Sequence, residues 1–235
     1  MQTYGTLYLL PVGLGECNLE DVLPKRNFDL VKTLTYFIAE NAKEARAFLK
    51  QCAYPEISRA QLSLINQHVN ADELNDFIAP LLEGKDMGLM SDAGCPGIAD
   101  PGSEIIRLAH RKGIKVTPLI GPSSIVLSIM ASGFNGQNFA FVGYLPSDAA
   151  LLVKRIKELE QLAMKTGQTQ LFIETPYRNA SLLQVLISQL QPNTCLAISC
   201  GLTLIHSQTL SEKIYAWRQK PHTLSLNFPS VFAIG

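Results

Sequence analysis

The chain has 235 residues, 47% of them hydrophobic, and its 20 basic and 20 acidic side chains give a formal net charge of zero. A chain of this length can fill one sizeable core or two compact ones without disulfides or metals. The neutral balance argues against a protein that binds nucleic acid through overall positive charge. The halves differ slightly, because residues 1–118 carry 12 basic and 15 acidic side chains, whereas residues 119–235 carry 8 and 5.

The cysteines and the apolar runs limit the compartment and the class of protein. The five cysteines are odd in number and lack CxxC spacing, so the sequence predicts neither a disulfide framework nor a metal site. The first apolar run is short, lacks a basic start and is broken by Pro11, and no run of 18 apolar residues occurs anywhere. We therefore expect a cytoplasmic protein that is neither exported nor inserted in a membrane.

Strand-like and helix-like runs alternate in the first half of the chain, which predicts a parallel-rich sheet. The expected strands are 6–12, 35–40, 86–90 and 114–120. The expected helices are one opened by Asn41 with Glu44 at the spacing of a capping box, one over 71–84 stopped by Gly84, and one over 103–113 with Asp100 as its cap.

The second half repeats the alternation after a helix over 121–133. The expected strands are 138–146, 169–176 and 194–200, and the expected helices are 147–165 and 178–190. The runs 222–228 and 230–235 are joined by Pro229 and predict an antiparallel hairpin. The fold class is therefore α/β, with one α/β domain over 1–118 and a second over 119–235.

The loop SDAGCPGIADPG, residues 91–102, is the most informative stretch of the chain. Its glycines can adopt positive φ or let a ligand approach the backbone, and its two prolines fix the turns. It follows a strand and precedes a helix, and ligands of open α/β sheets bind beyond the carboxyl ends of the strands. The loop therefore predicts a ligand site built mainly from backbone.

Four motifs in order along the chain resemble one family: PVGLG (11–15), the loop 91–102, GPSS (121–124) and GYLP (143–146). They are similar to motifs of the tetrapyrrole methylase superfamily of S-adenosylmethionine-dependent methyltransferases, on its ribosomal RNA small subunit methyltransferase I branch, which methylates a ribose 2′-oxygen. The segment IETPYR (173–178) stands where that branch has a Glu-Ser-Pro-His-Arg type motif. The resemblance implies two α/β domains with a cofactor cleft between them, and a homodimer.

The resemblance also assigns residues to the cofactor, S-adenosylmethionine. These cofactor-binding candidates are Pro11, Gly13, Ser91, Asp92, Ala93, Gly94, Ile98, Ser123 and Ser124. PVGLG is not a dinucleotide fingerprint, because Asn18 stands where a third glycine is needed.

The candidate catalytic residues are Glu174, Tyr177 and Arg178, because a hydroxyl acceptor must lose its proton to a base or a hydrogen-bonding network. A structural alternative is that Glu174 caps the following helix and pairs with Arg178. Cys95 is expected to be a small packing residue.

Three segments differ from the branch, namely AENAKEAR (39–46), SCGLTL (199–204) and SLNFPS (225–230). Three functions therefore stay open. The first is methylation of an RNA ribose or a similar acceptor, the second is methylation of a tetrapyrrole or another small molecule, and the third is cofactor binding without catalysis.

Overall fold

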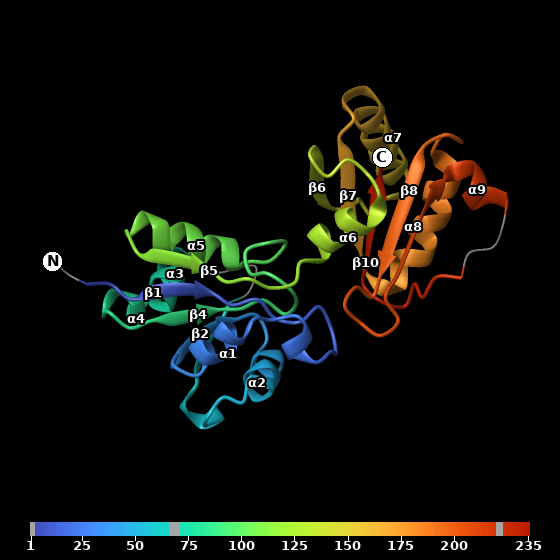
Figure 1. Cartoon of the computed structure of the whole chain (residues 1–235). Helices are drawn as coiled ribbons and strands as arrows, with labels where there is room; N and C mark the ends of the chain where they lie inside the picture. The colour runs from blue at the N-terminus through green and yellow to red at the C-terminus, as the bar shows by residue number, and fades with distance from the viewer. Residues whose placement is uncertain (1–2, 66–70, 220–222) are drawn as a thin grey trace. The chain divides into compact units, whose positions relative to one another are not determined.

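A computed structural model describes residues 3–65, 71–219 and 223–235, and the chain forms two compact units, Met1–Ser123 and Ser124–Gly235. Each unit has its own sheet and its own helices (Figure 1). Within the described residues, no helix has the length and apolar character needed to cross a membrane.

The first unit is a parallel sheet with helices on both faces. Its strands are β1 (Thr6–Leu9), β2 (Tyr36–Ala39), β3 (Gln61–Leu64), β4 (Met87–Leu89) and β5 (Lys115–Pro118), in the order β3-β2-β4-β1-β5. Its helices are α1 (Lys25–Val31), α2 (Ala42–Gln51), α3 (Ala71–Phe77), α4 (Ala79–Leu82) and α5 (Gly102–Arg111), with 3₁₀ turns η1 (Leu19–Asp21) and η2 (Ile57–Arg59).

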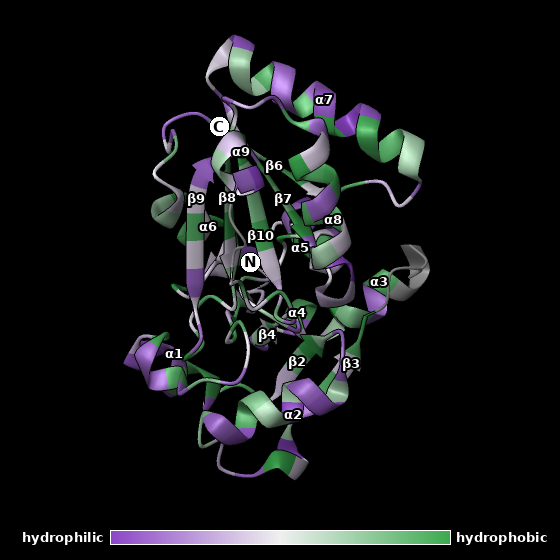
Figure 2. Ribbon diagram, turned by 90° about the vertical axis from the view of Figure 1, so that its right-hand side faces the viewer, coloured by the Kyte–Doolittle hydropathy of each residue, from purple (hydrophilic) through white to green (hydrophobic). Residues whose placement is uncertain are grey.

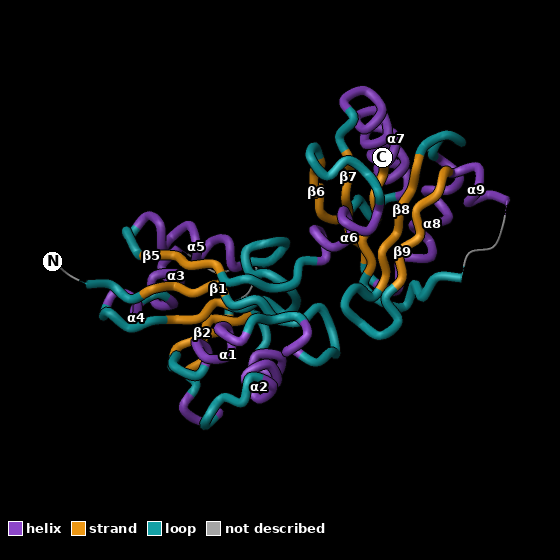
Figure 3. The backbone as a smooth tube through the Cα atoms, in the orientation of Figure 1, coloured by secondary structure: helices purple, strands orange, loops and turns teal. Residues whose placement is uncertain are grey.

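Adjacent residues of the buried strands face opposite cores. Phe37 packs with residues of α1 and α2, whereas the next residue, Ile38, packs with α4 and α5. Helices α1 and α2 therefore cover one face of the sheet, and α3, α4 and α5 cover the other (Figures 1 and 3). This is the layering that right-handed crossovers produce when the chain first moves one way across the sheet and then returns.

Several local expectations are confirmed, and two are corrected. Asn41 caps α2 by accepting a hydrogen bond from the Lys43 N–H, and Gly84 follows α4 with φ of +82°. The single helix expected over 71–84 is two helices, because Pro80 lacks the N–H that a continuous helix requires. The expected cap at Asp100 is displaced by one residue: α5 begins at Gly102, and the Asp100 carboxylate accepts the Gly102 N–H at 2.8 Å.

The second unit is a mixed sheet in the order β6-β7-β10-β8-β9, and among its described strands only the pair of β6 and β7 is parallel. Its strands are β6 (Phe139–Tyr144), β7 (Thr169–Glu174), β8 (Cys195–Cys200), β9 (Gln208–Lys213) and β10 (Ser230–Ile234). Its helices are α6 (Ser124–Ser132), α7 (Ala149–Thr166), α8 (Pro176–Gln189) and α9 (Ile214–Gln219). Helix α6 packs on one face of the sheet, and α7, α8 and α9 pack on the other.

The hairpin expected over 222–235 is wrong. Residue 222 lies outside the described residues, 223–229 form no strand, and β10 lies between β7 and β8. The reason is the buried Asn179, whose amide donates hydrogen bonds to the Leu226 and Phe228 carbonyls at 2.8 Å each. A side chain of α8 thus replaces the strand partner that the alternating pattern suggested.

Replacing Asn179 with leucine should lower the free energy of unfolding by about 2–4 kcal/mol, because two partly buried carbonyls lose their donor. Fluorescence of Trp217 reports this change, since the chain's single tryptophan is buried in the second unit. Gln184→Leu, at an exposed position of the same helix, is the control and should change stability by less than about 0.5 kcal/mol. Equal effects of the two substitutions would contradict this account of the 223–229 segment.

Candidate functional site

The first unit has a topological switch between its neighbouring strands β1 and β4. The chain leaves β1 toward α1 on one face of the sheet, and it leaves β4 toward α5 on the other face. The two loops therefore diverge and leave a crevice at the carboxyl ends of these strands, which is the usual ligand position in open α/β sheets.

Two backbone hydrogen bonds hold the diverging loops together. The Val12 N–H donates to the Gly94 carbonyl at 2.9 Å, and the Gly94 N–H donates to the Gly13 carbonyl at 3.3 Å. Gly94 has φ of +74°, which L side chains rarely adopt, and a Cβ there would lie 3.1 Å from the Leu14 side chain. Glycine at this position therefore allows the loop after β4 to pair with the loop after β1.

The Asp100 side chain holds the rest of the loop after β4 in one conformation. Both carboxylate oxygens of Asp100 accept the Gly97 N–H at 2.9 Å, and one of them also accepts the Gly102 N–H. Gly97 has φ of +83°, and the Ile106 side chain would lie 2.7 Å from a Cβ there. The loop is thus held by hydrogen bonds between its own Asp100 side chain and its backbone.

Cys95 faces the segment that follows β5. Its thiol donates to the Pro122 carbonyl at 3.3 Å, and burial raises the pKa of the thiol above its usual value. The group is therefore a neutral thiol at neutral pH and a poor nucleophile. This geometry supports the packing role expected for Cys95.

The loop after β1 also contacts the segment after β5. A Cβ on Gly121 would lie 2.1 Å from the Pro11 Cβ, so glycine is required for the two segments to pack this closely. The segment after β5 thus packs directly on the loop after β1.

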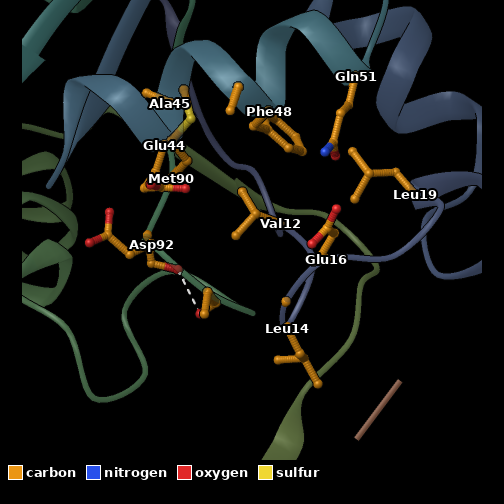
Figure 4. Close-up of a pocket in the computed structure, with 15 residues that line it drawn as sticks. Val12, Leu14, Glu16, Leu19, Glu44, Ala45, Phe48, Gln51, Met90 and Asp92 are labelled. Carbon is orange, nitrogen blue, oxygen red and sulfur yellow. Dashed lines mark hydrogen bonds between the residues drawn. The ribbon is translucent and has the colours of Figure 1, made fainter. Parts of the chain in front are cut away.

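A pocket of about 370 Å³ opens where the two bridged loops face α2 (Figure 4). Glu44, Phe48 and Gln51 extend from α2 toward the loops, and Val12 and Met90 form part of its apolar floor. The lining residues are Val12, Gly13, Leu14, Gly15, Glu16, Leu19, Glu44, Ala45, Ala47, Phe48, Gln51, Met90, Ser91, Asp92 and Ala93.

The pocket is acidic. Glu16, Glu44 and Asp92 line it, whereas no lysine, arginine or histidine is among its lining residues. Glu40, at the end of β2, lies beside it and accepts the Asp92 N–H at 3.4 Å. Such a pocket favours a ligand that carries positive charge.

Burial and neighbouring negative charge raise the pKa values of carboxyls at this edge of the sheet. Burial, followed by repulsion from Asp92, raises the pKa of Glu40, and burial, followed by repulsion from Glu44, raises the pKa of Asp92. Burial also raises the pKa of Asp100, against the two backbone N–H groups that stabilise its charge. A cation bound at this edge would relieve the repulsion.

The candidate catalytic residues lie in the second unit, where β7 meets α8. The Glu174 carboxylate is buried, accepts the Thr175 N–H at 2.7 Å and lies 3.2 Å from the Arg178 guanidinium. The ion pair between Glu174 and Arg178, which was expected as the structural alternative to a catalytic role, is therefore present. Tyr177 is 83% exposed, so its ring is free to contact a ligand.

Curated proteins provide the sequence comparison, and no family model matches the chain. The chain is 34% identical to ribosomal RNA small subunit methyltransferase I of Xylella fastidiosa over 184 residues, which are 78% of this chain and 63% of that protein. It is 32% identical to the Streptococcus pyogenes serotype M6 protein of the same name, covering 75% of this chain and 58% of that protein, and 27% identical to the Escherichia coli O157:H7 protein, covering 91% and 72%. The chain spans about three fifths of the length of the first two.

Solved structures share the fold. The methyltransferase CobJ matches with a TM-score of 0.62 over 98% of this chain and 93% of its own, at 16% identity. Uroporphyrin-III-C-methyltransferase from Thermus thermophilus matches with a TM-score of 0.54 over 98% and 94%, also at 16% identity. The chain is thus similar in sequence to proteins named ribosomal RNA small subunit methyltransferase I, and it has the fold of these two solved methyltransferases. The expected fold, two α/β parts of the tetrapyrrole methylase type, is confirmed.

The structure gathers some of the predicted cofactor residues and leaves others apart. Gly13, Ser91, Asp92 and Ala93 line the pocket. Five others do not line it, and their cofactor role stays a prediction: Pro11, Gly94, Ile98, Ser123 and Ser124. Pro11 and Gly94 nevertheless shape the loops, as described above, whereas Ile98 is about half exposed and Ser124 opens α6.

Sequence reasoning missed the contribution of α2 and of Glu16. Glu44, Phe48 and Gln51 recur at intervals of four and three residues, so they share one side of the helix. Glu40 directly follows a buried strand and therefore lies at the same sheet edge as Ser91. The spacing of Glu44, Phe48 and Gln51 could have identified the α2 residues from the sequence. The parallel strand order could have identified Glu40.

The raised carboxyl pKa values predict how stability depends on pH. These groups bind protons more tightly in the folded state, so the free energy of unfolding falls as pH rises from their ordinary values near 4 through the raised ones. Asp92→Asn removes one charge and relieves Glu40, and it should raise the melting temperature at pH 7 by about 1–2 °C.

The gain should shrink near pH 3, below the ordinary pKa of both carboxyls, because protonation removes the repulsion between them. Circular dichroism melts at the two pH values measure it, and Asp29→Asn, at an exposed position of α1, is the control. An equal gain at both pH values, or the same gain in the control, would contradict the repulsion described here.

Proposed function

We propose that the protein is an S-adenosylmethionine-dependent methyltransferase that holds its cofactor at the carboxyl edge of the first unit's sheet. The observation that carries this proposal is the bridge between Val12, Gly13 and Gly94 at the switch between β1 and β4, with the acidic pocket beside it. Curated relatives named as methyltransferases support the reaction class.

The residues present fit this cofactor. S-adenosylmethionine carries a sulfonium and an ammonium group, and the pocket has three carboxylates and no basic side chain. Val12, Phe48 and Met90 provide an apolar surface for a base, while small residues such as Gly13 and Ala93 leave the backbone accessible. When bound, the cofactor supplies an electrophilic methyl group on sulfur.

The pocket residues mainly position the cofactor, since methyl transfer depends on alignment with the acceptor. Asp92 and Glu44 would orient the cationic groups, and the fixed loop would hold the methyl group in one direction. The bridge between the loops keeps this arrangement from relaxing. This is how the chain's own residues would contribute to the rate.

For the acceptor we propose an RNA ribose hydroxyl, because the curated relatives are named for ribosomal RNA. Tyr177 would stack on a base of the acceptor, as exposed aromatic side chains do in RNA recognition. Glu174 is buried and committed to Thr175 and Arg178, so it would act by holding Arg178 in place. Arg178 would then hydrogen-bond the acceptor.

Two related properties belong to the same proposal. The resemblance of the motifs to the superfamily supports a homodimer, which light scattering with size-exclusion chromatography would test. We propose a cytoplasmic location on the same ground, because the proposed acceptor is ribosomal RNA.

A small-molecule acceptor, such as a tetrapyrrole, is the second candidate function. It is favoured by the name of one structural neighbour, uroporphyrin-III-C-methyltransferase, which shares the fold at 16% identity. Transfer of radiolabelled methyl groups to undermethylated small ribosomal subunits, compared with a panel of tetrapyrroles, separates the two. Cofactor binding without transfer to any acceptor would indicate a noncatalytic protein.

Calorimetric titration with S-adenosylmethionine and S-adenosylhomocysteine tests the cofactor site directly. Ala93→Trp should weaken binding of both ligands by at least about tenfold, because an exposed small residue that lines the pocket becomes one that fills it. Asp92→Asn should weaken binding of S-adenosylmethionine more than binding of S-adenosylhomocysteine, since only the former carries the sulfonium charge.

The matched control is Ala79→Trp. Ala79 is also exposed in the first unit, but it opens α4, whose Leu81 carbonyl accepts the Gly5 N–H at the opposite edge of the sheet. The Ala79→Trp variant should bind both ligands with the affinity of the wild type. Normal affinity in Ala93→Trp, or no binding of either ligand by the wild type, would refute the proposed site.

A further inference from the structure

Three of the five acidic side chains of the second unit are buried or half-buried. Residues 124–235 contain eight lysines and arginines against five acids, Asp148, Glu158, Glu160, Glu174 and Glu212. Glu160 and Glu174 are buried, and Glu212 is half-buried. Glu160 accepts hydrogen bonds from the Gln191 N–H and the Thr194 hydroxyl, which explains why it is inside. The exposed charge of this unit is therefore more positive than its composition indicates.

Helix α7 concentrates that positive charge. Its buried side contains Leu152, Ile156, Leu159 and Ala163, which pack in the core of the second unit. Lys154, Lys157 and Lys165 are exposed, and the helical spacing places them away from these buried positions. Figure 2 shows the hydrophilic positions of α7, acidic as well as basic, in purple. We call these three lysines the α7 lysine row.

The geometry of the row suits an extended polyanion. Lys154 and Lys165 are eleven residues apart, which is about three helical turns and about 16 Å along the axis. A stacked nucleic-acid strand has a phosphate about every 3.4 Å of its axis, so several phosphates pass over this length. Asp148 caps the start of the helix, and Glu158 is paired with Arg155 at 3.2 Å, so no acid of α7 pairs with the row.

A membrane surface is a poorer partner for the same helix. An interfacial helix inserts its apolar face among lipids, and the apolar face of α7 is already covered by its own unit. The apolar side chains left on the outside, Leu151, Leu162 and Met164, are separate positions beside the row. The row therefore fits a hydrophilic polyanion better than a bilayer.

We propose that the α7 lysine row is a docking surface for the phosphate backbone of RNA, separate from the pocket in the first unit. This inference rests on the proposed RNA acceptor and adds to it a surface that holds the strand without reading its sequence. It also explains how a chain of zero net charge can bind RNA.

The test compares two triple variants that lose the same charge. One is Lys154→Gln, Lys157→Gln, Lys165→Gln, and the other is Arg111→Gln, Lys112→Gln, Lys115→Gln at exposed positions of the first unit. The affinity of the whole protein for a short fluorescein-labelled single-stranded RNA is measured by anisotropy between about 50 and 200 mM salt. Trp217 melts and titration with S-adenosylhomocysteine establish that both variants are folded and bind cofactor product normally.

The α7 variant should bind the RNA more weakly, and the slope of log affinity against log salt should fall by about 2, which corresponds to three lost phosphate contacts on a single strand. The control variant should keep the wild-type slope. An unchanged slope in the α7 variant, an equal fall in the control, or wild-type binding only to phosphatidylglycerol vesicles would overturn the proposal. Normal binding of S-adenosylhomocysteine alongside any of these results would leave the proposed function standing.

Discussion

The bridge between the loops after β1 and β4 is the constraint on which the rest of the site depends. The two loops leave neighbouring strands toward opposite faces of the sheet. Without the hydrogen bonds at Gly94 the two loops would move apart, and the crevice between them would lose its shape. A side chain at Gly94 would meet Leu14 as well as an unfavourable φ. Because the bridge fixes both loops, the pocket wall needs no bulky residue, and its surface stays available to a ligand.

Much of this arrangement could be predicted from the sequence, because its signals are local. Alternating strands and helices indicated the parallel sheet, and the glycines and prolines of residues 91–102 indicated a rigid loop at its carboxyl edge. Asn41 and Gly84 marked helix ends, because a cap is an interaction between near neighbours in the chain. The family resemblance rested on the same loops, and the curated relatives bear it out.

The errors lie where a distant residue decides the local structure. Residues 223–229 have a strand-like pattern, but their carbonyls are taken by Asn179, which is more than forty positions earlier in the chain. Strand β9 was missed because its outward residues are polar and only its pairing with β8 defines it. The acidic pocket was missed for a similar reason, since Glu16, Glu44 and Asp92 come from three segments that only the strand order brings together.

The net charge of zero conceals a difference in charge distribution between the two units. In the first unit, carboxyls are crowded at a partly buried edge, where their mutual repulsion costs stability unless a cation is present. In the second, Glu160 and Glu174 satisfy internal hydrogen bonds and ion pairs, and the lysines of α7 stay outside. The excess negative charge of the first unit and the excess positive charge of the second cancel in the composition of the whole chain. A cationic cofactor and an anionic acceptor would each meet a surface of opposite sign, and neither surface is visible in a count of charged residues.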